Sequence, residues 1–123
     1  MSQGQSARRR RVLVIDDHPD TAATMALTLQ ELGHRAEFAI NGYSALTLCE
    51  TFRPDVVFVD MNLPDFHGSD LSRLLRIKCE PHPIRVIAMT GYGESERSRA
   101  DSAGCDVFLK KPIDWSEINS LLA

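Results

Sequence analysis

Five polar residues that could do chemistry together stand directly after short apolar runs of this 123-residue sequence. They are Asp16, Asp17, Asp60, Thr90 and Lys111. Carboxylates that converge repel one another, and a hard divalent cation such as Mg²⁺ relieves that repulsion through oxygen ligands. A carboxylate can also be a nucleophile that forms an acyl phosphate, while hydroxyl and ammonium groups hold the transferred oxygens. If the five side chains meet, they predict Mg²⁺-dependent phosphoryl transfer to Asp60.

The apolar runs before these residues are short and rich in Val and Ile, as in Val12–Ile15 and Val56–Val59. Such runs are typical of strands buried on both faces of a parallel sheet. Between them, apolar residues recur at helical spacing, so five strands alternate with five helices. The pattern predicts an α/β, flavodoxin-like (βα)5 fold, with a five-stranded parallel sheet of order 2-1-3-4-5 and helices on both faces.

This topology is what should bring the polar residues together. The site of an open α/β sheet lies beyond the carboxyl ends of its strands. In the expected order the first and third strands are neighbours, so the Asp16–Asp17 doublet should face Asp60. The fourth and fifth strands then add Thr90 and Lys111. Competing phosphate loops are absent, because the sequence has neither GxGxxG nor GxxxxGK[ST].

The expected elements can be placed along the chain. The strands are residues 11–16, 34–39, 55–60, 84–89 and 106–110. The first helix begins near Pro19 and stops at Gly33, and the third follows Gly68 with Leu71, Leu74 and Leu75 on its buried side. Residues 94–103 favour a helix but are nearly all polar, which predicts a weakly packed element suited to shifting between arrangements.

Composition and charge narrow the possible functions. With 43% apolar and 25% charged residues the chain predicts one globular domain over residues 11–123, preceded by a disordered basic arm over residues 1–10. Residues 11–123 hold 11 basic and 17 acidic side chains, a net charge of −6, which disfavours direct binding to nucleic acid. No membrane-length apolar run or secretory signal is present, so we expect a cytoplasmic protein without membrane contact.

The sequence resembles the receiver domain of two-component response regulators. The matching segments are VLVIDD (Val12–Asp17), VVFVDMNLPDFHG (Val56–Gly68), VIAMTGYG (Val86–Gly93) and FLKKPID (Phe108–Asp114). Their order and spacing make the resemblance specific, and it covers Arg11 to about Leu122. The last segment is as similar to receivers of hybrid histidine kinases as to those of transcription factors. Two features depart from the usual pattern: Phe66-His67 replaces Met-Asp before Gly68, and Phe108 replaces a more common Tyr.

The resemblance implies a phosphoacceptor signalling switch. Asp60 would accept a phosphoryl group from the phosphohistidine of a histidine kinase or histidine phosphotransfer protein. Asp17 would bind Mg²⁺ directly, Asp16 through water, and Asn62 through its backbone carbonyl.

The resemblance also gives roles to the residues around the acceptor. Thr90 would bond the phosphoryl group and move, and Lys111 would pair with a phosphoryl oxygen before a cis bond to Pro112. Phe108 would be the switch aromatic, on one face with Lys110 and across from Leu109. Phosphorylation would then change the face made by residues 94–103, the fifth strand and the last helix, which an effector domain or protein would read.

Some alternatives stay open at this point. A Mg²⁺-dependent aspartyl phosphatase of the haloacid dehalogenase type needs an acid two residues after its nucleophile, where this chain has Asn62. A pseudo-receiver would act as an interaction module without phosphorylation. We favour a non-enzymatic switch that catalyses only its own phosphorylation and dephosphorylation.

Several residues should border the site without a fixed role. Gly91, Tyr92 and Pro112 would flank the phosphoryl group, with Tyr92 and Asn62 tuning access of water. His18 and His67 also flank the site. A metal or phosphoryl role stays open for both, and we favour the interpretation that they are exposed loop histidines.

Overall fold

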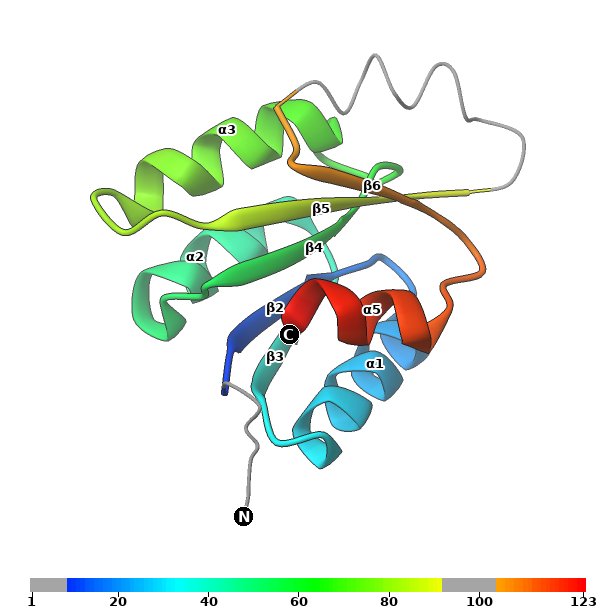
Figure 1. The fold of residues 1–123 in the computed structure, drawn as a ribbon. Coiled ribbons are helices and arrows are strands. Elements are labelled where there is room, and N and C mark those ends of the chain that lie inside the picture. Colours follow the sequence, from blue (N-terminus) through cyan, green and yellow to red (C-terminus); the bar gives the residue numbers. More distant parts are fainter. Residues whose placement is uncertain (1–8, 92–103) are drawn as a thin grey trace.

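The computed structural model describes residues 9–91 and 104–123, and its centre is one parallel sheet (Figure 1). The strands are β2 (Arg11–Ile15), β3 (Arg35–Ala39), β4 (Val56–Asp60), β5 (Arg85–Thr90) and β6 (Val107–Lys110). Their order across the sheet is β3-β2-β4-β5-β6, and every neighbouring pair is parallel. In chain order this is second, first, third, fourth, fifth, so the predicted topology is confirmed.

Helices cover both faces of the sheet. Those in the described residues are α1 (Pro19–Glu31), α2 (Gly42–Phe52), α3 (Gly68–Cys79) and α5 (Trp115–Leu122). In Figure 1, α1 and α5 lie on one side of the sheet and α2 and α3 on the other. The helix expected over residues 94–103 falls outside the described residues. None of the helices that the structure describes is long and apolar enough to cross a membrane.

The two central strands are buried on both faces, as their apolar sequences predict. Side chains alternate between two cores. Val14 and Phe58 belong to the core under α1 and α5, whereas Ile15 and Val59 belong to the core under α2 and α3. This alternation fixes the faces toward which the strand ends present their next side chains.

One core position predicted in the third helix is wrong. Leu71 and Leu75 of α3 are fully buried, but Leu74 is 38% exposed. The buried residues of α3 follow i, i+3 and i+4 spacing along one stripe: Gly68, Leu71, Ser72, Leu75 and Cys79. Leu74 belongs to the same turn but lies off that stripe, so it faces outward.

Only part of the predicted basic arm can be described, since residues 1–8 lie outside the described residues. The Arg10 side chain donates hydrogen bonds to the carbonyl oxygens of Leu122 and Ala123, at 3.2 and 3.0 Å. Its backbone N–H donates to Nδ1 of His34 at 3.0 Å. Arg10 therefore links the start of β2 to the end of α5, and disorder of the preceding arm remains a prediction.

The loop between β4 and α3 holds the start of α2. Asp65 accepts hydrogen bonds from the backbone N–H groups of Gly42 and Tyr43, at 2.8 and 3.0 Å. The first N–H groups of an α-helix have no acceptor within that helix. An acidic side chain at this end therefore accepts their hydrogen bonds and interacts favourably with the helix dipole. The next residue, Phe66, packs on Tyr43 with ring centroids 5.1 Å apart, and a Cβ on Gly42 would collide with its ring. Phe66, which replaces the Met that receiver domains commonly have here, therefore packs the loop against the start of α2.

We predict that Asp65→Ala lowers the free energy of unfolding by about 1 to 2 kcal/mol, because two N–H groups of α2 lose their acceptor. Urea unfolding followed by circular dichroism measures this. The control is Asp70→Ala, which removes an exposed acid from the first turn of α3 and its ion pair with Arg73. That change should cost clearly less. Equal losses in the two variants would contradict the capping role of Asp65.

Candidate functional site

Neighbouring strands deliver the predicted acids to one edge of the sheet. Asp60 is the last residue of β4 and pairs with Met89 of β5. Asp16 directly follows β2, which lies beside β4 in register from Val12 with Val56 to Ile15 with Val59. Both acids continue the alternation toward the α1 and α5 face. The carboxyl ends of two adjacent parallel strands therefore place two carboxylates side by side.

Lys111 joins these two carboxylates. Its Nζ lies 3.1 Å from Oδ2 of Asp16 and 3.2 Å from Oδ2 of Asp60. The carboxylates are buried, with only 1% of Asp16 and 4% of Asp60 exposed. The backbone N–H of Lys111 donates to the carbonyl of Thr90, which extends the β5–β6 ladder by one residue. The bond from Lys111 to Pro112 is cis, as the resemblance implied.

Backbone N–H groups hold the remaining oxygens of both acids. The N–H of Asn62 donates to Oδ1 of Asp60 at 2.9 Å, and the N–H of His18 donates to Oδ1 of Asp16 at 3.0 Å. In both cases the donor is two residues after the acid, a local turn that aspartate side chains commonly form. The predicted contact of Asn62 through its backbone carbonyl stays a prediction.

The two acids differ in pKa although they share one ammonium. Burial, together with the nearby charge of Asp16, raises the pKa of Asp60 despite the opposing effects of the Asn62 N–H and Lys111. Burial also acts to raise the pKa of Asp16, but the His18 N–H and Lys111 outweigh it and hold that pKa below its ordinary value. One positive charge does not fully offset two buried negative charges, so the site favours a further cation.

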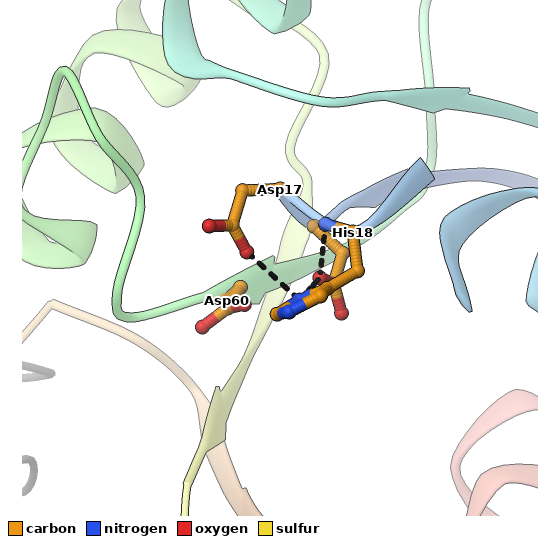
Figure 2. Close-up of side chains that lie close together, drawn as sticks. Asp17, His18 and Asp60 are labelled. Atoms are coloured by element: carbon orange, nitrogen blue, oxygen red, sulfur yellow. Dashed lines mark hydrogen bonds and ion pairs between the residues drawn. The ribbon is translucent and has the colours of Figure 1, made fainter. Parts of the chain in front are cut away.

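Asp17 and His18 lie close to Asp60, and the ring of His18 turns toward the carboxylate of Asp17 (Figure 2). Asp17 is on the loop after β2, and its side chain is 37% exposed. Ligand atoms of Asp16, Asp17, His18 and Asp60 all lie within 4.8 Å of one another. Three carboxylates in this arrangement fit a hard divalent cation such as Mg²⁺.

Thr90 has a buried hydroxyl for which the described residues offer no hydrogen-bond partner. The residue is fully buried, and its Oγ1 makes no hydrogen bond within residues 9–91 and 104–123. A buried hydroxyl without a partner is costly, which suits a group that bonds an acceptor in another state of the protein. In the β5–β6 ladder Thr90 pairs with Lys110, and Ala88, two residues before Thr90, pairs with Phe108. Thr90, Lys110 and Phe108 therefore share a face, as predicted for Phe108, opposite Leu109.

A groove of about 790 Å³ opens beside the acids, between α1 and α5. Its lining is mostly apolar and includes Gly91, Pro112 and the only tryptophan of the chain, Trp115. Asp16 and Lys111 lie at the same groove, so the site is accessible from this side. Tyr92, the other residue expected to flank the phosphoryl group, falls outside the described residues.

Two features of the site were not found from the sequence. We favoured an exposed loop histidine over a metal or phosphoryl role for His18, yet its ring faces Asp16 and Asp17. The sequence signal was its place directly after the doublet, which gave no ring orientation. Asp65 is likewise an ordinary loop acid in sequence, and only the three-dimensional contact with α2 reveals its function.

The family model described as "Response regulator receiver domain" matches residues 12–123. Among curated proteins, the chain is 32% identical to "Sporulation initiation phosphotransferase F" of Bacillus subtilis, and the match covers 88% of this chain and 86% of that protein. It is 31% identical to "Sensor histidine kinase GacS" of Pseudomonas protegens over 92% of this chain. The chain spans only 13% of the length of GacS.

A solved structure adds a phosphorylated relative with the same fold. It is a response regulator protein from Burkholderia pseudomallei "with a phosphorylated aspartic acid, calcium ion and citrate". The two chains superpose with a TM-score of 0.80 at 29% identity, over 93% of this chain and 66% of that one.

We predict that Asp60→Asn stabilises the metal-free protein at pH 7. Because the pKa of Asp60 is raised above its unfolded value, the folded state binds more protons than the unfolded state between those two pKa values. Stability is therefore lost as the pH rises through this range. Replacing the ionised group with an amide should add about 1 kcal/mol or more at pH 7.

Urea unfolding at pH 7 and near pH 4, with and without Mg²⁺, checks this prediction. The gain should shrink at the lower pH, and Mg²⁺ should stabilise the wild type clearly more than the variant, which lacks one of the three carboxylates. Asp20→Asn, an exposed acid in the first turn of α1, is the control and should show neither effect. A less stable Asp60→Asn protein at pH 7 without metal would contradict the charge balance described above.

Proposed function

The chain belongs to the response regulator receiver domain family, and from this premise we propose that Asp60 is its phosphoacceptor. Receiver domains are phosphoacceptor switches of two-component signalling, and they interact with histidine kinases or phosphotransfer proteins. We propose that a phosphohistidine on such a protein is the donor for Asp60. The resulting acyl phosphate would change the face that an effector domain or protein reads.

The position of Asp60 carries this proposal. Both oxygens of the Asp60 carboxylate have donors. Oδ2 lies 3.2 Å from Lys111 Nζ, and Oδ1 accepts a hydrogen bond from the N–H of Asn62. It is buried, yet it lies at the carboxyl edge of the sheet beside an accessible groove lined by Lys111. A carboxylate so placed can act as a nucleophile while neighbouring donors stabilise the transferred group.

The transfer can be written for this chain's own residues. A carboxylate oxygen of Asp60 attacks phosphorus, a new O–P bond forms, and the N–P bond of the phosphohistidine breaks with its electron pair returning to the imidazole. Lys111 can move from the Asp60 carboxylate to a phosphoryl oxygen and keep its contact with Asp16. The hydroxyl of Thr90 can then donate to another phosphoryl oxygen.

We propose that Asp16, Asp17 and Asp60 hold Mg²⁺, with Asn62 adding its backbone carbonyl. When bound, Mg²⁺ supplies positive charge that offsets the carboxylates and the transferred oxygens. The donor set supports this assignment, because three carboxylates converge and Lys111 neutralises only part of their charge.

The switch would run from Asp60 to Thr90, which lies on the opposite face of the sheet. Thr90 and Phe108 lie on the face away from Leu109, which packs in the core under α1 and α5. A Thr90 side chain drawn toward a phosphoryl group would therefore alter packing near Phe108. We propose that residues 94–103, β6 and α5 change together as the interaction face.

We infer a switch that catalyses only its own phosphorylation and dephosphorylation, because Asn62 cannot act as the general acid that an aspartyl phosphatase needs at that position. A net charge of −6 over residues 11–123 argues against direct nucleic-acid contact. A cytoplasmic location without membrane contact stays a prediction.

Incubation with acetyl phosphate and Mg²⁺ tests the acceptor. Acetate leaves as the Asp60 oxygen binds phosphorus, so intact mass spectrometry should show the gain of one phosphoryl group. The gain should disappear in Asp60→Asn and when Mg²⁺ is chelated. Asp20→Asn should be phosphorylated like the wild type. A wild type that binds Mg²⁺ but gains no mass would favour a pseudo-receiver instead.

We predict that Thr90→Val separates stability from signalling. Valine has nearly the same shape as threonine and removes a buried hydroxyl that lacks a partner in the described residues, so the unphosphorylated protein should gain about 1 kcal/mol. Urea unfolding measures this gain. The phosphorylated variant should also show smaller hydrogen-exchange changes at β6 and α5 than the wild type does. Wild-type exchange changes in Thr90→Val would exclude Thr90 from the switch.

A further inference from the structure

His18 occupies a position where its side chain would ordinarily cap a helix. It is the N-cap residue of α1, directly before Pro19, but its ring makes no capping hydrogen bond in the described structure. The ring turns toward the acids instead, as Figure 2 shows. Its Nδ1 lies 3.1 Å from Oδ1 of Asp17 and 3.4 Å from Oδ1 of Asp16.

The contacts of Asp16 divide the site into two sides. Its Oδ2 contacts the ammonium of Lys111, whereas its Oδ1 accepts from the His18 N–H and faces the His18 ring. Lys111 therefore holds one side with a fixed positive charge. The other side presents oxygens of Asp16 and Asp17 together with one ring nitrogen.

This second side resembles a ligand set of mixed chemistry. One atom from each of Asp16, Asp17, His18 and Asp60 lies within 4.8 Å of the others. Metal–ligand bonds to nitrogen and oxygen are about 2.0 to 2.2 Å long, so only a small contraction would bring the four atoms around one ion. Mg²⁺ prefers oxygen ligands, whereas imidazole nitrogen suits Co²⁺, Ni²⁺, Cu²⁺ and Zn²⁺.

We propose that His18 is a further protein ligand of the metal site, binding through Nδ1, and that it shifts the site's preference from Mg²⁺ toward first-row transition metals such as Co²⁺ and Zn²⁺. This inference rests on the proposed function, because it assumes that Asp16, Asp17 and Asp60 hold the metal. Binding requires a lone pair on Nδ1, so the ring proton is carried on Nε2. With 74% of the side chain exposed, solvent can hydrate that N–H.

His67 provides a matched control. It is also an N-cap residue, at the start of α3, and its ring likewise makes no capping hydrogen bond in the described structure. It is exposed, and it is not among the clustered ligand residues found in the described part of the chain. A general effect of losing an exposed loop histidine should therefore appear in His67→Asn as well as in His18→Asn.

The test is isothermal titration of the full chain with Co²⁺ and, separately, with Mg²⁺. In His18→Asn the Co²⁺ affinity should fall about tenfold or more, in the range found when a metal site loses a supporting group, while the Mg²⁺ affinity changes much less. The visible absorption of bound Co²⁺ should shift as nitrogen is replaced by oxygen. His67→Asn should match the wild type, and circular dichroism confirms that both variants fold.

Each other outcome overturns the inference. Equal losses for Co²⁺ and Mg²⁺ would mean that His18 acts through general electrostatics. Unchanged binding of both ions would remove any role, and tighter binding of both would mean that the ring obstructs the site. Asp17→Asn separates this failure from that of the proposed function: if it leaves the binding of both metals unchanged, the acids themselves are not the metal site.

Discussion

The properties of the candidate site follow from two buried carboxylates that share one ammonium. Asp16 and Asp60 are almost completely removed from water, and Lys111 contacts one oxygen of each. Such an arrangement keeps a net negative charge in a low-dielectric site, where charge is expensive to hold. The neighbouring backbone N–H groups reduce this cost but do not remove it. The same imbalance that lowers stability makes the edge of the sheet receptive to a cation.

The alternation of side chains along the strands determines which residues could respond to a change of charge at Asp60. Asp16 and Asp60 continue the residues that pack under α1 and α5, whereas Thr90 and Phe108 lie on the opposite face. The acceptor and the proposed switch residues therefore occupy different faces, and the end of β5 lies between them. In the proposed switch, a chemical change at Asp60 would therefore reach Phe108 on the other face through Thr90.

Much of this arrangement could be predicted because it follows from periodicity. Apolar runs located the strands, parallel order made Asp16 and Asp60 neighbours, and the side chains at the strand ends followed. Contacts set by loop geometry could not be predicted: the ring of His18 turns to the acids, and Asp65 caps a helix that begins 23 residues earlier. Leu74 was misplaced since helical spacing alone does not centre the buried stripe.

The central claim is that the phosphoryl group resides on Asp60. It is tested most directly by phosphorylating the chain with a phosphohistidine-bearing protein and reducing the product with borohydride. Reduction converts an aspartyl phosphate to homoserine, which tandem mass spectrometry can locate by residue. The account predicts homoserine at position 60 alone. Reduction at Asp16 or Asp17, or a phosphoryl group that resists reduction because it resides on His18, would contradict it.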